Sequence, residues 1–332
     1  MEPILILAIL TSFIFTLLIL PKWIKKCHMV GLLWEDMNKP NHPKNVAASG
    51  GIIVVMSFIL GVMVYIAIRT FLFNDLEGVS LQIFALLAVI LILAITGLTD
   101  DLLGWKHGGL SRRFRLFLAI FASIPLVIIN AGDQIVSLPL LGAINFGILY
   151  SLIIVPLGVV GATTVYNFLA GFNGLESGQG IIILSYLSFV AYWTGNGWLS
   201  VVGLCMVASL IVFYFYNKVP AKVFPGDILT WSVGALVASM AILGNFEKVA
   251  LFVFIPYMLE LILKARGGLK KQSFGIPQSD GSLKMPYDKV YGLTHLSILI
   301  LSKFKKKVYE QDVVYLIFSF QMLIILLSLF LL

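Results

Sequence analysis

Ten apolar segments divide this chain of 332 residues and largely decide what it can fold into. Sixty per cent of the residues are hydrophobic, 12% are charged, and the mean hydropathy is +1.01. A run of about 18 or more apolar residues can cross the hydrocarbon core of a bilayer as a helix. We therefore predict an all-α polytopic membrane protein with ten transmembrane helices. The segments are 3–21, 50–72, 80–99, 115–131, 146–167, 179–195, 198–217, 229–244, 247–264 and 312–332.

The whole chain, residues 1–332, is expected to form a single integral-membrane domain. Its first segment lacks the basic leader and small-residue cleavage site of a signal peptide, so we expect a retained helix. Cys27 and Cys205 are too few for a disulfide framework and lack the spacing of metal ligands. The net charge of +7 does not indicate nucleic-acid binding, because the basic residues are concentrated in particular loops.

Lysine and arginine are distributed unevenly between alternate loops. If ten helices alternate, 21 of the 23 basic residues lie on one side of the membrane, and only Arg69 and Lys248 lie near the other. By the positive-inside rule, the basic side is cytoplasmic and both termini face the opposite side. The basic residues of the cytoplasmic loops are Lys22, Lys25, Lys26, Lys39, Lys44, Lys106, Arg112, Arg113, Arg115, Lys218, Lys222, Lys264, Arg266, Lys270, Lys271, Lys284, Lys289, Lys303, Lys305, Lys306 and Lys307.

The longest cytoplasmic loop, residues 265–311, contains two expected elements. The turn residues from Gln278 to Gly281 predict a small hairpin. The stretch 292–307 is apolar and then strongly basic, which is typical of an interfacial helix. Its terminal lysine cluster, residues 303–307, either binds anionic headgroups, at roughly 1 kcal/mol per charge, or only sets the topology.

Polar residues gather where apolar segments end on the predicted cytoplasmic side. Asp100 and Asp101 follow the third segment, Asn167 ends the fifth, and Asp227 precedes the eighth. Two adjacent carboxylates repel each other and are costly near hydrocarbon, so they need a cationic partner. A transporter more often places ionisable groups near the bilayer midplane. The pattern therefore predicts an active site at the cytoplasmic membrane face, open to one water-soluble and one lipid substrate.

The segment 166–180 combines glycines with two amides. The glycines let the backbone approach a ligand closely, and exposed N–H groups in such turns bind phosphate oxygens. Asn167 and Asn173 supply uncharged ligands or hydrogen bonds to the edge of a base. Glycine is also common in membrane helices, and Gly174 with Gly178 could simply pack helices as a GxxxG motif. The asparagines at a membrane exit favour the ligand-binding interpretation.

Asp227 follows a Pro-Gly turn and precedes the eighth apolar segment. By itself it could be a helix cap, since a carboxylate at a helix N-terminus is favoured by about 0.3–1 kcal/mol. Together with Asp100, Asp101 and Asn167 it indicates a magnesium site. Mg²⁺ binds one or two carboxylates and completes its octahedron with substrate phosphates and water, so a diphosphate substrate fits.

Three motifs occur in a recognisable order along the chain. An acidic pair follows the third segment, Asn167-Phe-Leu-Ala-Gly-Phe-Asn-Gly-Leu-Glu-Ser-Gly-Gln179 follows the fifth, and Phe224-Pro-Gly-Asp227 precedes the eighth. Residues 36–39 and 283–289 add to the pattern. This order resembles that of the polyprenyl-phosphate N-acetylhexosamine-1-phosphate transferases, glycosyltransferase family 4. The chain is most similar to their eukaryotic and archaeal dolichyl-phosphate branch, which is blocked by tunicamycin, and the resemblance spans nearly the whole chain.

The resemblance implies a reaction, a metal and a membrane. A Mg²⁺-dependent enzyme, also served by Mn²⁺, would transfer GlcNAc 1-phosphate from UDP-GlcNAc to a polyprenyl (dolichyl-type) phosphate and release UMP. This reaction would be the first membrane step of lipid-linked oligosaccharide assembly for protein N-glycosylation. The expected setting is the cell membrane of an archaeon or the endoplasmic reticulum membrane of a eukaryote. The expected partners are the lipid bilayer and a second copy of the chain, with no nucleic acid.

The resemblance also implies roles for individual residues. Asn167 and Asp227 are the expected metal ligands, and Asp100, Asp101 and Arg115 are the expected catalytic residues, with Asp100 as a base for the lipid phosphate. Arg115 departs from the family's usual lysine and replaces a point charge with a rigid fork. The residues expected to bind the UDP-sugar are Asn173, which would read uracil, and Glu176, Phe224, Lys106, Arg266 and Lys271.

Departures from the family leave the sugar open. The histidine run of the bacterial cell-wall enzymes is absent, which argues against a MurNAc-pentapeptide substrate, and Gly275 stands where the eukaryotic branch has an arginine. Another UDP-N-acetylhexosamine is therefore an alternative donor. An intramembrane prenyltransferase would need two aspartate-rich motifs, and one adjacent pair is present. A transporter of lipid-linked or nucleotide sugars would need midplane charges and inverted repeats, which the sequence does not show.

Overall fold

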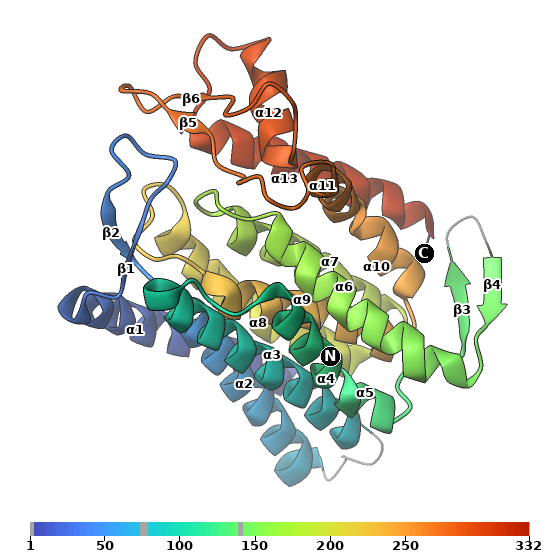
Figure 1. Cartoon of the computed structure of the whole chain (residues 1–332). Coiled ribbons are helices and arrows are strands. Elements are labelled where there is room, and N and C mark those ends of the chain that lie inside the picture. The colour runs from blue at the N-terminus through green and yellow to red at the C-terminus, as the bar shows by residue number, and fades with distance from the viewer. Residues whose placement is uncertain (1–2, 74–78, 139–141, 332) are drawn as a thin grey trace.

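The computed structural model describes residues 3–73, 79–138 and 142–331, and helices packed into a bundle dominate it (Figure 1). In chain order the helices are α1 (Ile6–Val30), α2 (Gly51–Ile68), α3 (Ser80–His107), α4 (Arg112–Ala122), α5 (Ile124–Ile128), α6 (Val155–Phe168), α7 (Leu175–Trp193), α8 (Gly197–Asn217), α9 (Gly226–Gly244), α10 (Glu247–Val253), α11 (Ile255–Arg266), α12 (Leu293–Ser302) and α13 (Glu310–Ser328). Short helical turns occur at Pro3–Leu5, Arg69–Phe73, Tyr150–Ile154 and Leu329–Leu331.

Within the described residues, seven helical stretches are long and apolar enough to cross a membrane. They are Ile6–Val30, Gly51–Phe73, Ser80–Gly104, Tyr150–Phe168, Gly197–Asn217, Gly226–Gly244 and Glu310–Leu331. The mostly helical, multi-pass character is thus confirmed, whereas the count of ten stays a prediction.

The difference between seven and ten lies in three segments. Segment 115–131 is divided at Ser123 into α4 and α5, and segment 247–264 is divided at Phe254 into α10 and α11. Each second helix has proline in its first turn, where the missing N–H costs no hydrogen bond but where a continuous helix would be interrupted. α7 is continuous, but polar residues in its first two turns lower its mean hydropathy.

In the described parts of the chain, three small antiparallel strand pairs depart from the all-α prediction. β1 (Leu33–Glu35) pairs with β2 (Lys44–Ala47), β3 (Ile135–Leu138) with β4 (Gly142–Asn145), and β5 (Ile276–Pro277) with β6 (Leu283–Lys284). The third encloses the Gln278–Gly281 turn, where the sequence predicts a hairpin, and α12 covers part of the predicted interfacial helix. The other two are missing from the prediction because strands of three or four residues carry little periodicity.

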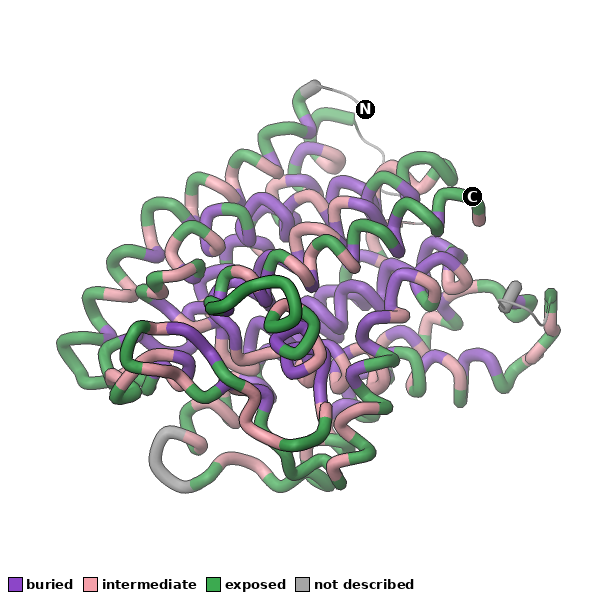
Figure 2. The backbone as a smooth tube through the Cα atoms, turned by 90° about the horizontal axis from the view of Figure 1, so that it is seen from above, coloured by how far each residue is buried: buried purple, intermediate pink, exposed green. Residues whose placement is uncertain are grey.

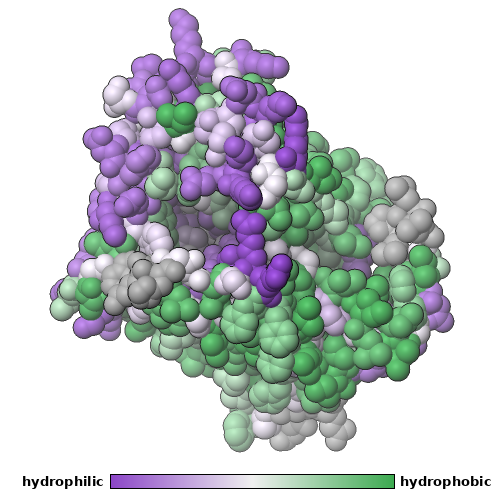
Figure 3. All heavy atoms as spheres, in the orientation of Figure 1, coloured by the Kyte–Doolittle hydropathy of each residue, from purple (hydrophilic) through white to green (hydrophobic). Residues whose placement is uncertain are grey.

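Polar and apolar surfaces are separated along the bundle. Figure 3 shows hydrophilic residues gathered around a hollow at the end where Figure 1 places β5, β6 and α12, while the rest of this face is largely apolar. Large apolar side chains are exposed on the helices, among them Leu18, Ile95 and Phe117. Hydrocarbon accommodates such a surface and water does not. The polar end therefore marks a boundary between membrane and water.

α9 is the central helix of the bundle. It contacts α2, α3, α6, α7, α8 and α10, and it is the most enclosed of the seven candidate spans. Figure 2 shows the buried backbone running through the middle of the molecule. Small residues along α9 permit close helix packing. At Gly234, an added Cβ would lie 2.7 Å from Thr163 Cα on α6.

α3 lies directly against the first turn of α9 at Gly97. An added Cβ on Gly97 would lie 2.6 Å from both the Asp227 carbonyl carbon and Ile228 N, closer than real Cβ atoms approach backbone. Glycine at this position therefore lets the polar end of α3 meet the start of α9.

Gly97→Ala is expected to lower the stability of the protein by about 1–3 kcal/mol, the usual cost of overpacking a well-packed core. The measurement is thermal unfolding of the purified protein in detergent. Gly161→Ala is the matched control, because an added Cβ on this helical glycine would meet nothing within 4 Å. Equal midpoints for the two variants would show that α3 and α9 do not need this close contact.

Candidate active site

A cavity of about 530 Å³ lies between the polar loops and the ends of α3, α6 and α9. This volume is within the usual range of protein ligand pockets, about 300–1,000 Å³. Its walls come from parts of the chain that are far apart in sequence. Six of the eleven side chains predicted from the sequence line it: Asp101, Asn167, Asn173, Glu176, Phe224 and Asp227.

Asp101 binds the start of α9. Its Oδ1 accepts a hydrogen bond from Asp227 N at 2.7 Å, and its Oδ2 accepts one from Ile228 N at 3.4 Å. These are N–H groups of the first helical turn, which have no partner within the helix and favour negative charge. Gly226 makes room for the contact, since an added Cβ would lie 2.2 Å from Asp101 Oδ2. Asp101 therefore positions Asp227.

Asp100 faces a different partner, Arg115. Arg115 Nη1 lies 2.9 Å from Asp100 Oδ2 and 3.4 Å from Asp227 Oδ2, so one guanidinium balances two carboxylates. Leu110 N donates to the other oxygen of Asp100. Arg115 is presented by α4, which is capped by the preceding residue Ser111, whose Oγ accepts from Phe114 N at 3.3 Å. Arg115, an expected catalytic residue, thus lies beside Asp227, an expected metal ligand.

Asn167, Thr230 and Asp227 form the part of the cavity wall that could hold a metal. Thr230 Oγ1 lies 2.9 Å from Asn167 Oδ1 and 3.2 Å from the backbone oxygen of Asp227, and it joins the ends of α6 and α9. Across the described ranges, no group of three or more His, Cys, Asp or Glu residues could hold a metal. One carboxylate and one amide oxygen nevertheless fit Mg²⁺, a hard cation that takes few protein ligands and relies on phosphates and water.

Glu176 shapes the loop between α6 and α7. Its Oε1 accepts from Gly171 N at 2.8 Å, and Tyr166 Oη donates to its backbone oxygen at 2.6 Å. Gly171 has a φ of +104° and an added Cβ would lie 2.8 Å from the Phe274 ring. The loop therefore needs glycine here both for its backbone conformation and for its packing against Phe274.

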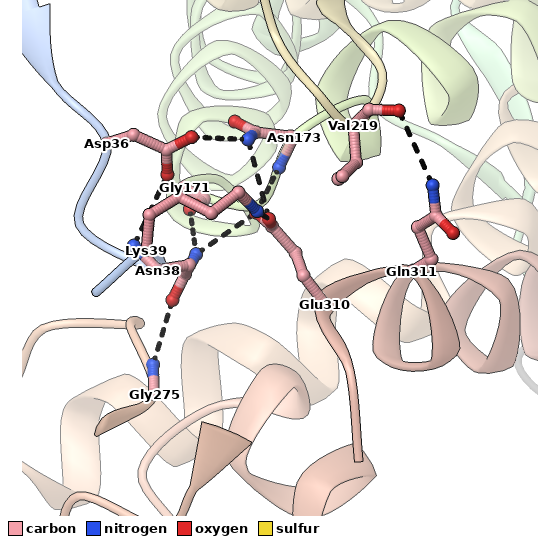
Figure 4. Close-up of polar contacts among 9 residues, drawn as sticks. All are labelled: Asp36, Asn38, Lys39, Gly171, Asn173, Val219, Gly275, Glu310 and Gln311. Atoms are coloured by element: carbon pink, nitrogen blue, oxygen red, sulfur yellow. Dashed lines mark hydrogen bonds and ion pairs between the residues drawn. The ribbon is translucent and has the colours of Figure 1, made fainter. Parts of the chain in front are cut away.

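A buried polar network ties this loop to distant parts of the chain (Figure 4). Asn38 Nδ2 donates to Gly171 O at 2.8 Å, and its Oδ1 accepts from Gly275 N at 3.1 Å. Glu310, in the first turn of α13, accepts from Asn173 N at 2.7 Å and forms an ion pair with Lys39. Four segments are thereby joined: the β1–β2 loop, the α6–α7 loop, the β5 segment and α13.

Residues 272–274 form another wall of the cavity and are held from behind. Gln272 and Phe274 line the cavity, whereas Ser273 points the other way: its Oγ contacts Lys264 Nζ at 2.5 Å, and its backbone oxygen accepts from Thr294 Oγ1 at 2.8 Å. Burial, together with the charge of Lys264, lowers the pKa of the neighbouring His295 to about 4. This imidazole is therefore neutral at neutral pH.

The remaining predicted residues fall outside the cavity lining. Arg266 and Lys271 are exposed, and Lys271 Nζ lies over the rings of Tyr287 and Tyr291 at 4.7 and 5.6 Å. Lys106 belongs to the last turn of α3, but its side chain is outside the described part of the structure. The roles of these residues in binding the UDP-sugar stay predictions.

Sequence reasoning missed Glu310 and Thr230. Glu310 looks like an ordinary acidic residue at a helix start, which the helix dipole alone would favour. Thr230 lies inside an apolar segment, and a threonine in such a segment usually bonds to its own helix. The spacing of Thr230 three residues after Asp227 was the available signal, because it places both side chains near the same helix end.

The fold and the cavity define a class: a multi-pass helical membrane protein with an oxygen-rich site at one polar end of the bundle. Residues 83–245 match the profile of glycosyl transferase family 4. A protein of Saccharolobus solfataricus is 36% identical over 91% of this chain and 89% of its own length, and one of Sulfolobus acidocaldarius is 32% identical over 97% and 94%. The chain belongs to glycosyl transferase family 4.

These relatives carry informative names. Both archaeal proteins are provisionally named UDP-N-acetylglucosamine–dolichyl-phosphate N-acetylglucosaminephosphotransferase. A Dictyostelium discoideum protein bears the same name without that qualification, and it is 29% identical over 77% of this chain and 67% of its own length.

Proposed function

We propose that this chain transfers N-acetylglucosamine 1-phosphate from UDP-GlcNAc to a dolichyl-type polyprenyl phosphate and releases UMP. Family membership and the names of three relatives support the reaction. The observation that carries it is the position of the cavity, where Asp101, Asn167 and Asp227 meet at the point at which the apolar bundle surface gives way to polar loops. A water-soluble nucleotide sugar and a membrane-bound phosphate can both reach such a place.

In the proposed reaction, an oxygen of the polyprenyl phosphate attacks the β-phosphorus of UDP-GlcNAc. The bond from this phosphorus to the bridging oxygen breaks, UMP leaves, and a lipid-linked diphosphate remains. The attacking phosphate is already largely ionised near neutral pH, so the step needs little general-base help. Alignment of the two phosphates and compensation of their charge are then the main catalytic contributions.

The residues divide this work between them. Arg115 lies beside Asp100 and Asp227 and can turn its remaining donors to a phosphate oxygen. Asp101 keeps the start of α9, and with it Asp227, in place. Asn167 and Asp227 would hold the Mg²⁺, or Mn²⁺, for which the family's reaction calls. When bound, the metal would neutralise charge between the attacking and leaving phosphates.

We further propose ten membrane spans, both termini on the non-cytoplasmic side, and a cytoplasmic active site. The support is the strong asymmetry of lysine and arginine between alternate loops. The location would be the cell membrane of an archaeon or the endoplasmic reticulum of a eukaryote.

The reaction is tested directly by UMP release. Purified protein in lipid nanodiscs is expected to release UMP when given Mg²⁺, a polyprenyl phosphate and UDP-GlcNAc, and to do so more slowly with other UDP-N-acetylhexosamines. Asp227→Asn should abolish release, whereas Asp133→Asn, at an exposed position outside the cavity lining, should not. Absence of release with every UDP-N-acetylhexosamine would overturn the proposal, and a stronger response to a different sugar would replace the donor.

Arg115 should act through its charge. Arg115→Met is expected to lower kcat/KM about 100-fold or more, because two carboxylates and the phosphates lose their cation. Arg115→Lys should retain most of the rate, since a lysine supplies the charge. Arg113→Met, on the exposed side of the same helix, is the matched control. Equal rates for Arg115→Met and Arg113→Met would remove Arg115 from the mechanism.

Metal binding can be measured apart from turnover. The affinity of the protein for Mn²⁺ in the presence of UMP can be measured by electron paramagnetic resonance. Asn167→Ala is expected to lower this affinity about 10–100-fold. Asn196→Ala is the control, because Asn196 lies at the start of α8 and outside the cavity lining. An unchanged affinity for Mn²⁺ in Asn167→Ala would show that Asn167 is not a metal ligand.

A further inference from the structure

The side-chain amide of Asn173 is held by two carboxylates from distant segments. Asn173 Nδ2 donates to Asp36 Oδ2 at 2.8 Å and lies 3.4 Å from Glu310 Oε2, while Asn173 N donates to Glu310 Oε1 at 2.7 Å. Figure 4 draws bonds to both nitrogens of Asn173 and none to its Oδ1. Over the described ranges of the chain, no donor reaches this oxygen, although Asn173 is 5% exposed and lines the cavity.

The two carboxylates fix which end of the amide faces them. An ionised carboxylate only accepts hydrogen bonds, so the amide must present its NH₂ group to Asp36 and Glu310. Turning the amide by 180° would place Asn173 Oδ1 against Asp36 Oδ2 at hydrogen-bond distance, with two acceptors facing each other. Asn173 Oδ1 is therefore held as a free acceptor at the cavity wall.

Glu310 is itself held in place. It pairs with Lys39, and Asn38 Nδ2 lies 3.3 Å from its Oε1. Asn38 N in turn lies 3.3 Å from Asp36 Oδ1. The orientation of one amide is thus set by a largely buried network that joins the β1–β2 loop to α13.

We infer that Asp36 and Glu310 are positioning residues that set the base preference of the nucleotide site through Asn173. An acceptor fixed at the cavity wall favours a base whose ring nitrogen carries a proton and disfavours one whose ring nitrogen has a lone pair. Uracil presents N3–H and cytosine presents an unprotonated N3, so the site selects uridine nucleotides. This inference rests on the proposed function, because it concerns the same cavity and the same donor.

Neutral amides at positions 36 and 310 would remove the constraint. Asparagine or glutamine both donates and accepts, so the Asn173 amide could take either orientation with a partner for each. In the turned orientation its NH₂ group would face the cavity and suit cytosine. A variant that only distorts the cavity would bind both UMP and CMP more weakly. A variant that frees the orientation of the Asn173 amide would instead change the ratio of the two affinities.

The test measures the affinities of UMP and CMP for the full-length protein in detergent, by isothermal titration calorimetry. Wild-type protein is expected to bind UMP about 30-fold more tightly than CMP, because Asn173 Oδ1 would face the acceptor N3 of cytosine instead of the donor N3–H of uracil. The double variant Asp36→Asn/Glu310→Gln is expected to reduce this ratio below about 3-fold, with CMP binding improved in absolute terms. Asp36→Asn alone should reduce it partly.

Asp312→Asn is the matched control, since Asp312 is an acidic residue in the same turn of α13 that contacts Lys305 and Tyr309 N instead of the cavity loop. It should keep the wild-type ratio. If the double variant does not fold, as judged by thermal unfolding, Asp36→Asn carries the test. A folded variant with the wild-type ratio would overturn the inference and leave the proposed function standing. A wild-type protein that binds neither nucleotide would overturn both.

Discussion

The bond between the Asp101 carboxylate and the backbone N–H groups of Asp227 and Ile228 is the interaction on which the site depends. It joins the polar end of α3 to the start of the central helix and uses the positive end of that helix to stabilise a charge near hydrocarbon. Gly97 and Gly226 provide the room for it. Asp227 lies in the turn that this junction holds, and Arg115 and the end of α6 contact the same turn.

A consequence is that acidic residues here serve structure as much as chemistry. Asp101 caps a helix, Glu176 holds a loop, and Glu310 orients an amide, while Asp100 is paired with Arg115. A reaction whose nucleophile is already an anion has little need of a strong base. Carboxylates around it can therefore be used to fix positions, provided that cations balance their charge.

The sequence was sufficient for part of this arrangement. Apolar runs predicted a helical membrane protein, and the placement of Asp101, Asn167 and Asp227 at segment ends predicted that they meet. The sequence could not predict the different partners of Asp100 and Asp101. Adjacent residues of a helix point only about 100° apart, and the partners of these two come from other helices. The breaks that make α4, α5, α10 and α11 also depend on packing that hydropathy does not record.

The directions of side chains in loops are the part of the site that sequence predicts least, and the reason is physical. Arg266 and Lys271 lie outside the cavity lining, whereas Gln272 and Phe274 line it, and Ser273 between them is held by contacts with α11 and α12. No periodicity links such residues to one face. Glu310 escaped notice for a related reason, as its partners lie in two loops far from it in sequence.

The distance between Asn173 and Glu310, 137 positions along the chain, bears on how the protein is made. Helices enter a membrane in the order of their synthesis, so α3, α6 and α9 are in place before α13 exists. Until α13 arrives, Asn173 lacks one of its two carboxylate partners and the network of Figure 4 is open. A nascent chain would thus bring Asp100, Asp101 and Asp227 together early and complete the contacts around Asn173 only when α13 is inserted.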